Sequence, residues 1–346
     1  MSAAGLRCWV LTDGKAGTEN QCIGLAEAIG VEPVVKRVHP RAPWTWLPVG
    51  QWPLPHLALG ADSDPVAPPW PDLLIASGRR GVPYALAIKR WSGAATFTIQ
   101  VQDPRVSSNR FDMVAPPRHD HVRGANVVET QGALNRLTPA RLAAAAAAMA
   151  ARLSHLPRPL VAVLIGGSSN SYRLTPKTAR ELGQSLAAMA ASSGAGLVVT
   201  PSRRTGRSNV EALRAGLGMT TIKGSGTTIE IWDGANPNPY FGYLGLADAI
   251  VVTCDSVSMT SEACSTGKPV HVVELPGGAA KFHEFHASLR AGGLTRPFTG
   301  TLGRWSYEPL RDTAEVAAEV KQRLGRRLEG LGTAPGDDGL ADEKTG

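Results

Sequence analysis

The residues best suited to chemistry lie in Val251–Val270, where a short apolar stretch runs into a serine-rich turn and a short helix. Ser256 and Ser258 stand at the start of that helix, where the helix dipole and free N–H groups favour a pyrophosphate. Glu262 follows about one turn later, where its carboxylate is suited to accept hydrogen bonds from both hydroxyls of a ribose. Alternatively, Glu262 is an ordinary helix-start acid, stabilised by about 0.3–1 kcal/mol against the dipole. The same segment contains Asp255 and Met259.

A glycine-rich turn near the amino terminus follows the first apolar stretch, Cys8–Thr12. Its glycines permit a tight turn, and the helix after it offers N–H groups to an anion or a sugar. Asp13 and Glu19 are the carboxylates that could act there as a general base. A structural turn capped by Thr18 is the alternative. The residues expected to contact the acceptor or a phosphate are Gly14, Lys15, Gly17, Asn20 and Gln21.

Two further turns in the second half of the chain each follow an apolar stretch. The first contains Gly166, Gly167 and Ser168, in which glycine lets the backbone approach a ligand and serine supplies a short hydrogen-bonding group. The second contains Arg203 and Arg204, and paired arginines bind phosphate or carboxylate through bidentate hydrogen bonds. We expect both turns to contact a nucleotide sugar, with a solvated loop as the alternative for the arginines.

Polar residues after strands of the first half are candidates for binding an acceptor. Arg79 and Arg80 end one apolar stretch and suit an anionic acceptor. The loops 102–105 and 119–121 are weaker candidates of the same kind, because polar surface loops often have this composition.

The composition of the 346-residue chain excludes several classes of protein. Its hydrophobic fraction of 43% and charged fraction of 19% are those of an ordinary globular protein. The net charge of +7 is spread along the chain without long runs of one sign, so we expect no nucleic-acid partner. The 4 cysteines have no zinc-type spacing and are expected to be small buried hydrophobic residues in a reducing compartment. His283 and His286 lack a third ligand, so we expect no metal and no cofactor.

Strand-like and helix-like stretches alternate along the chain, which predicts parallel sheets built from β-α-β units. Prolines at 157 and 159 interrupt the series. We therefore predict two Rossmann-like, doubly wound α/β domains facing a cleft, at residues 1–156 and 157–330, and a disordered tail at 331–346. Ligands of such sheets bind at the carboxyl ends of the strands, where the turns above lie. Strands are expected at 8–12, 34–38, 73–76, 95–100, 113–115, 127–129, 160–165, 196–200, 228–232, 249–254 and 270–274, and helices at 139–153, 176–192, 209–217, 239–246, 259–265 and 312–328.

Trp44, Trp46 and Trp52 lie among prolines in one long connection that also contains Arg41. Such tryptophans usually pack under a loop, but apolar loops beside basic residues also dock on membrane surfaces. The chain has no signal-like start and no uncharged stretch of about 20 apolar residues. We therefore expect a cytoplasmic protein, with a peripheral position at the inner face of a membrane as a hypothesis.

The pattern Ser-x-Ser-Met-x-Ser-Glu-Ala-x-x-x-Gly-x-Pro-Val at residues 256–270 resembles the donor site of GT-B glycosyltransferases. The resemblance implies that Glu262 holds the ribose of a nucleotide and that Ser256 and Ser258 lie near its pyrophosphate. It also implies donor-sugar contacts after the last strand of the second sheet, at Lys281, His283 and Glu284.

A larger set of motifs is similar to the mitochondrial fission "elongated mitochondria" family, which has a GT-B-like fold. The matching motifs are 9–17 with Asn20 and Gln21, 166–168, 202–205, 238–240 and 253–259. The resemblance implies a role like that of the plant members, which act at the outer mitochondrial surface with a dynamin-related partner. Among the GT-B glycosyltransferases that the chain resembles, the lipid-linked peptidoglycan N-acetylglucosaminyltransferase has a histidine as the proposed base in the first glycine turn. This chain has Thr18 at that position. Binding is therefore better supported than catalysis.

These observations lead to three hypotheses. In the first, the protein binds a nucleotide-diphosphate sugar and transfers the sugar without a metal to an envelope or lipid-linked acceptor. In the second, it is a non-catalytic adaptor on the same scaffold and recruits a membrane-remodelling, dynamin-like protein. In the third, it is a nucleotide-sugar epimerase that pairs His283 with Asp13.

Overall fold

The computed structural model describes residues 5–219, 228–235 and 237–332. The predicted tail lies outside these residues from position 333 onward, whereas residues 331 and 332 end the last helix. The elements of the first half are β1 (Cys8–Thr12), α1 (Ala16–Ile29), β2 (Pro33–Arg37), η1 (Trp44–Trp46), η2 (Pro55–Ala58), β3 (Leu73–Ser77), α2 (Val82–Trp91), β4 (Phe97–Val101), η3 (Ser108–Arg110), β5 (Met113–Ala115), η4 (Arg118–Asp120) and α3 (Pro139–Leu153). Those of the second half are β6 (Leu160–Ile165), α4 (Pro176–Ser193), β7 (Gly196–Pro201), α5 (Arg207–Gly216), β8 (Ile229–Ile231), α6 (Tyr240–Leu246), β9 (Ala249–Thr253), α7 (Val257–Cys264), β10 (Val270–Val273), α8 (Ala280–Ala291), β11 (Thr295–Pro297) and α9 (Asp312–Gly332).

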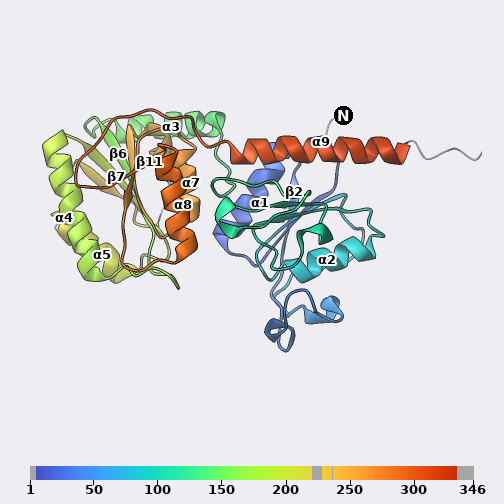
Figure 1. The fold of residues 1–346 in the computed structure, drawn as a ribbon. Helices are drawn as coiled ribbons and strands as arrows, with labels where there is room; N and C mark the ends of the chain where they lie inside the picture. Colours follow the sequence, from blue (N-terminus) through green and yellow to red (C-terminus); the bar gives the residue numbers. More distant parts are fainter. Residues whose placement is uncertain (1–4, 220–227, 236, 333–346) are drawn as a thin grey trace, which may run out of the picture.

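The strands form two parallel sheets, one in each of two α/β bodies that lie side by side (Figure 1). The first sheet has the order β2-β1-β3-β4-β5, and the second has the order β11-β10-β9-β6-β7-β8. In each sheet the strands are added first on one side of the strand that comes first in the sequence and then on its other side. The strand order therefore reverses between β1 and β3 in the first sheet and between β6 and β9 in the second. Such a reversal opens a crevice at the carboxyl ends of the two strands. The predicted pair of Rossmann-like domains is confirmed.

Strands β1, β3, β4 and β5 of the first sheet are buried, and their successive side chains, which point to opposite sides, enter a core on each face. Cys8 and Val10 belong to a core that includes residues of α1 and α9. Trp9 and Leu11 belong to a second core that includes residues of α2 and of the connection between β2 and β3. The sequence of β1 therefore reads as a continuous apolar run rather than an alternating one.

The second sheet has one large core, and all six residues of β6 are buried in it. Helices α4 and α5 pack against each other, as do α3 and α6. The last pair needs glycine in α6, since a Cβ at Gly242 would lie 2.4 Å from Met149 Cγ.

Two helices pack with the domain that lies across the sequence boundary predicted at residue 156. Leu153 of α3 belongs to the core of the second sheet. Val316, Val320 and Leu324 of α9 belong to the core of the first sheet, and α9 lies along the first domain in Figure 1. The domain boundary at residue 156 remains a prediction. In the structure, each domain packs against one helix from the other half of the chain.

Several local predictions differ from the structure. The strand expected at residues 127–129 is not formed, and in this range only Val127 makes an isolated bridge, to Val114 of β5. Helices α2 and α8 and strand β11 were not predicted. Helix α8 contains histidine and phenylalanine, which are weak helix formers.

The prediction that the cysteines are buried and unpaired is confirmed for Cys8, Cys22, Cys254 and Cys264. Burial raises the pKa of Cys8 to about 12 and that of Cys254 to about 11. These thiols are therefore protonated at neutral pH and act as apolar packing groups. None of the described helices is long and apolar enough to cross a membrane.

Replacement of a buried valine in α9 tests whether this helix stabilises the first domain. Val320 is fully buried, so Val320→Ala should lower the free energy of unfolding by about 1.5–3 kcal/mol. Chemical denaturation followed by circular dichroism measures the change. Exposed Gln322 on the same helix is the control, and Gln322→Ala should change stability by less than about 0.5 kcal/mol. Equal effects of the two variants would contradict the packing described here.

Candidate functional site

A cavity of about 650 Å³ lies between the two domains, where the carboxyl ends of both sheets meet. It is walled on one side by the start of α1 and on the other by the turns after β7 and β9 and by α6. The structure therefore brings together residues that the sequence analysis had assigned to a common site. The predicted residues that line this cavity are Lys15, Gly17, Asn20, Gln21, Arg203, Arg204, Ser256, Ser258, Met259 and Glu262.

Glu262 is held by a tyrosine that the residue-by-residue analysis did not single out. Tyr240 Oη donates a hydrogen bond to Glu262 Oε2 at 2.6 Å, and both side chains line the cavity. Desolvation raises the pKa of Glu262 to about 7, while the tyrosine hydrogen bond opposes the rise. Burial and then the neighbouring carboxylate raise the pKa of Tyr240 well above its usual value. No protein hydrogen bond occupies Oε1 of Glu262 within the described chain, so this oxygen is available to a ligand hydroxyl.

The amino terminus of α7 forms the part of the wall next to Glu262. Ser256 caps the helix by accepting a hydrogen bond from the N–H of Met259 at 3.3 Å. Ser258 faces the first domain, since a Cβ at Gly17 would lie 3.5 Å from its Oγ. The helix start and the first glycine turn therefore oppose each other across the cavity. This arrangement offers backbone N–H groups and hydroxyls to an anion.

The two arginines after β7 have different environments. Arg204 forms an ion pair with Asp255, with Nη2 2.8 Å from Oδ2. Arg203 lines the cavity and has no hydrogen bond or ion pair within the part of the chain that the structure describes. Thr200, at the end of β7, also lines the cavity and carries a buried Oγ1 without a hydrogen-bond partner there. Both groups are available to a ligand.

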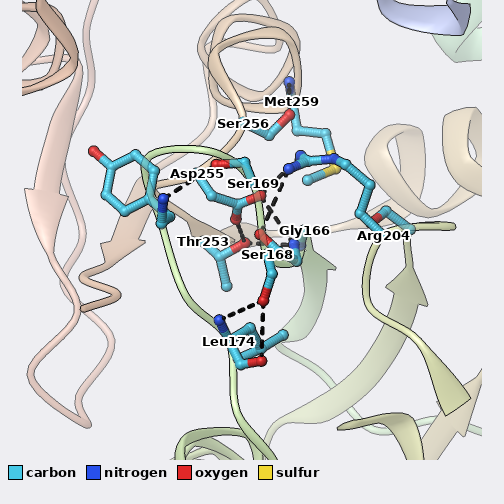
Figure 2. A network of polar contacts seen from close by, with 12 residues as sticks. Gly166, Ser168, Ser169, Leu174, Arg204, Thr253, Asp255, Ser256 and Met259 are labelled. Atoms are coloured by element: carbon cyan, nitrogen blue, oxygen red, sulfur yellow. Dashed lines mark hydrogen bonds and ion pairs between the residues drawn. The ribbon is translucent and has the colours of Figure 1, made fainter. Parts of the chain in front are cut away.

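Asp255 joins the turns after β6 and β9, as Figure 2 shows. Its carboxylate accepts hydrogen bonds from the N–H of Gly167 at 2.9 Å and the hydroxyl of Thr253 at 2.7 Å, in addition to the Arg204 contact. The Asp255 side chain is fully buried. It therefore positions the walls of the crevice and does not itself line the cavity.

Close packing against the protein explains the two glycines after β6. A Cβ at Gly166 would lie 2.2 Å from the Asp255 carboxylate oxygens, and one at Gly167 would lie 2.1 Å from the carbonyl oxygen of Arg204. Ser168 Oγ accepts a hydrogen bond from the N–H of Leu174 and donates one to its carbonyl oxygen. These groups contact protein rather than the cavity, although the sequence analysis had expected them to contact a ligand.

The two carboxylates considered as a general base are both paired. Glu19 binds the Arg37 guanidinium through both carboxylate oxygens, at 2.7 and 2.8 Å, and does not line the cavity. Asp13 is buried and lies 2.5 Å from Lys15 Nζ and 3.4 Å from Thr18 Oγ1. Since Lys15 and Thr18 line the cavity, Asp13 is the carboxylate nearer to it. Gly14 has a positive φ of 77° at the turn, which favours glycine there.

The residues expected to contact the donor sugar on α8 face the first domain instead. Lys281 Nζ lies 3.5 Å from Asp120 Oδ1, and Glu284 Oε2 lies 3.0 Å from His121 Nε2. These pairs connect α8 to the η4 turn. His283 is exposed and does not line the interdomain cavity. Among the residues that the structure describes, no three His, Cys, Asp or Glu side chains are grouped as metal ligands.

Arg79 and Arg80 follow β3 and are both exposed. Arg79 lines a second cavity of about 540 Å³, to which Lys281 also contributes, whereas Arg80 lines neither cavity. Of the two adjacent arginines, only Arg79 therefore lies at a cavity.

Three of the lining residues that the sequence analysis missed or gave little weight carry polar groups at the ends of strands or beside Glu262. Tyr240 appeared only within a family motif, Thr200 only as the end of a strand, and Gln102 only within a loop judged a weaker candidate. Thr200 and Gln102 lie at or just after the carboxyl ends of β7 and β4. A systematic reading of strand ends would have found both, but Tyr240 needs the tertiary structure.

Comparison with known proteins identifies the family. Residues 16–324 match the family described as Mitochondrial fission ELM1. The chain is 33% identical to mitochondrial fission protein ELM1 of Arabidopsis thaliana, over 93% of this chain and 92% of that protein. The chain belongs to the mitochondrial fission ELM1 family. This ELM1-family chain is also 24% identical to protein RP120 of Rickettsia prowazekii, over 92% of this chain and 99% of that protein.

Solved structures share the fold of this ELM1-family chain. One is the UDP-GlcNAc 2-epimerase of Neisseria meningitidis bound to UDP-GlcNAc, with a TM-score of 0.50 and 11% sequence identity. The comparison covers 95% of both chains. At this identity the similarity concerns the fold, and it agrees with the GT-B-like arrangement of two facing α/β domains.

Removal of the Asp255 carboxylate should destabilise the second domain. Asp255→Ala leaves the buried Gly167 N–H without its acceptor and should lower the free energy of unfolding by about 2–3 kcal/mol. Arg204→Ala should cost less than Asp255→Ala, because the Arg204 side chain is 42% exposed, so water can replace part of its contact with the carboxylate while the Gly167 and Thr253 hydrogen bonds remain. Urea denaturation compares the two variants. A larger loss in Arg204→Ala would contradict the central role of the carboxylate.

Proposed function

We propose that this protein binds a nucleotide-diphosphate sugar in the interdomain cavity and transfers the sugar to an acceptor hydroxyl without a metal ion. The observation that carries the proposal is the convergence of a free guanidinium, a helix start and the Glu262–Tyr240 pair on one cavity of about 650 Å³. These groups match the phosphates and the ribose of such a donor. A protein of the same fold holds UDP-GlcNAc, which makes UDP the first ligand to test.

Different groups of the cavity bind the ribose and the diphosphate of the donor. The free oxygen of Glu262 accepts hydrogen bonds from ribose hydroxyls, while Tyr240 fixes the carboxylate. The pyrophosphate lies against the start of α7, where N–H groups and the Ser258 hydroxyl point to the cavity. Arg203 and Lys15 supply positive charge from opposite domains, so closing of the cleft brings both to the diphosphate.

The transfer step forms a bond between the acceptor oxygen and the anomeric carbon of the sugar. The bond from that carbon to the diphosphate oxygen breaks, and the electron pair leaves with the diphosphate. Lys15, Arg203 and the α7 dipole stabilise the charge that develops there, the task that a metal ion performs in other transferases. Asp13 takes the acceptor proton, since Glu19 is fully engaged by Arg37. Proton transfer to Asp13 requires its contact with Lys15 to loosen.

An acceptor at a membrane surface is supported by residues 39–61, which we name the Trp loop and which form the first part of the connection between β2 and β3. It projects from the first domain in Figure 1 and exposes 79% of Trp46, 59% of Leu54 and 44% of Leu57. Trp52, in contrast, is buried. The loop contains no Asp or Glu. Apolar tips beside basic residues bind anionic lipid surfaces.

A non-catalytic adaptor is the second candidate function. It is favoured by the ion pairs of both candidate bases and by family membership with the plant mitochondrial fission protein. An adaptor does not need an open Glu262 oxygen or a free arginine in its cleft. The epimerase hypothesis finds less support, since His283, the residue that would act with Asp13, is exposed and does not line the cavity.

Calorimetry with nucleoside diphosphates and their sugars tests the proposed donor site, starting with UDP. Glu262→Ala should raise Kd about a hundredfold, because a charge-assisted hydrogen bond contributes roughly 1.5–3 kcal/mol. Glu211→Ala, at an exposed position of the same domain, should leave Kd unchanged. The proposal fails if the wild type binds none of these ligands. Capture of a dynamin-like protein that is indifferent to Glu262→Ala would favour the adaptor.

The affinity for UDP should depend on pH through Glu262. With a pKa of about 7, the carboxyl becomes protonated as pH falls from 8 to 6, and it then loses one acceptor site for ribose. We expect Kd to rise by up to about tenfold over this range. Glu262→Gln removes the titrating group. The variant should bind UDP more weakly, and its Kd should not show the rise that Glu262 causes between pH 8 and pH 6. The same pH response in both proteins would assign the titration to the ligand or to another residue.

Sedimentation with lipid vesicles tests the proposed membrane surface. The wild type should co-sediment with vesicles containing phosphatidylglycerol more than with neutral vesicles, and Trp46→Ala should reduce the bound fraction several-fold. Val34→Ala removes a 55% exposed apolar side chain outside the Trp loop and should have no effect. Unchanged binding of Trp46→Ala would count against this surface.

A further inference from the structure

The second cavity is built at the carboxyl edge of the first sheet. Its volume is about 540 Å³, and its walls come from the loops after β3, β4 and β5, from the Trp loop and from α8. Residues from both domains therefore enclose it. The lining residues that carry charge are Arg79, Asp103, Arg105, Asp120 and Lys281.

Positive charge exceeds negative charge in this cavity. Arg105 Nε lies 3.0 Å from Asp103 Oδ2, and Lys281 Nζ lies 3.5 Å from Asp120 Oδ1, so each of these cations has one carboxylate. Arg79 has no ion pair or hydrogen bond to any residue in the described ranges. An uncompensated guanidinium remains in a concave site that both domains line. Such a group binds oxyanions through paired N–H donors.

The backbone around the cavity adopts conformations that are rare for residues other than glycine. Gln102, Arg105 and His121 have positive φ angles of 72°, 60° and 55°, and they lie in or beside the loops after β4 and β5. The Asp103 carboxylate holds the first loop by accepting a hydrogen bond from the N–H of Arg105 at 2.7 Å. Such conformations are unfavourable, and they concentrate at ligand sites where the surrounding structure fixes them.

Gln102 connects this cavity to the proposed donor site, because it lines both. Its Nε2 donates a hydrogen bond at 3.2 Å to Oε1 of Gln21, which also lines the donor cavity. A molecule that extends from Arg79 past Gln102 would therefore present its far end to the donor sugar.

We infer that the second cavity binds a phosphate group of the acceptor, with Arg79 as its principal ligand and Arg105 and Lys281 as additional ones. This inference rests on the proposed transfer function, since it assigns the chemical class of the acceptor. A phosphate is favoured over a single carboxylate, because its larger number of oxygens can accept hydrogen bonds from the unpaired Arg79 and also from Arg105 or Lys281, which each already have one carboxylate partner. Lys281 belongs to the second domain, so bound phosphate would also hold the two domains together.

Titration of inorganic pyrophosphate into UDP-saturated protein tests the inference, because UDP occupies the donor cavity. Pyrophosphate should still bind, and Arg79→Ala should raise its Kd at least tenfold. The matched control is Arg80→Ala, which removes the same charge from a residue that lines neither cavity and should change Kd less than twofold. Because Arg79 is exposed and unpaired, its variant should remain folded. Acetate, with one charge, should bind much more weakly.

A parallel titration separates this inference from the proposed function. Arg203→Ala protein without UDP has a weakened donor cavity, and pyrophosphate binding to it should show the same dependence on Arg79. This arm remains informative if UDP does not bind at all. The inference is overturned if pyrophosphate binds neither protein, if Arg79→Ala and Arg80→Ala weaken binding equally, or if acetate binds as tightly.

Discussion

The buried carboxylate of Asp255 is the interaction on which the proposed donor site depends. It binds the turn after β6 through Gly167, the end of β9 through Thr253 and the turn after β7 through Arg204. These three strands are neighbours in the sheet, and their carboxyl ends form the crevice at the point where the strand order reverses. An ionised group without water must be fully hydrogen-bonded to be stable there, and Asp255 meets this requirement with groups from three loops. Arg203, the neighbour of Arg204, takes no part in this network and lines the cavity.

The relation between the domains depends on helices that cross between them. Helix α3 packs with the second sheet, although it precedes that sheet in the sequence, and α9 packs with the first sheet, although it follows the second. Asp312, at the start of α9, also accepts hydrogen bonds from the N–H groups of Gln131 and Gly132 at 2.8 Å. These contacts fix the chain on both sides of the cleft. The glycine turn of α1 and the start of α7 can therefore face each other at a defined separation.

The two cavities are neighbours along the cleft, because Gln102 lines both of them. The interdomain cavity, which we propose as the donor site, is lined mainly by residues of the second domain, whereas the second cavity contains an unpaired arginine from the first domain. The Trp loop contributes Pro48 and Val49 to the second cavity and carries the exposed Trp46. An acceptor with a phosphate and an apolar tail would match this sequence of surfaces. Asp13, the base in the proposed transfer, is paired with Lys15 in this structure.

The sequence by itself determined the fold class, the family and the main polar turns. Continuous apolar runs such as Leu160–Ile165 are typical of strands buried on both faces, and the pattern of Ser256, Ser258 and Glu262 depends only on neighbouring positions along one helix. Only the tertiary structure decided which of these groups face a ligand. The N–H of Gly167 donates to Asp255, Glu19 accepts from Arg37, and Glu262 accepts from Tyr240, and each of these pairs joins residues that are distant in sequence. Local patterns determine where a polar group stands along the chain, but its partner depends on packing that brings separate strands and domains together.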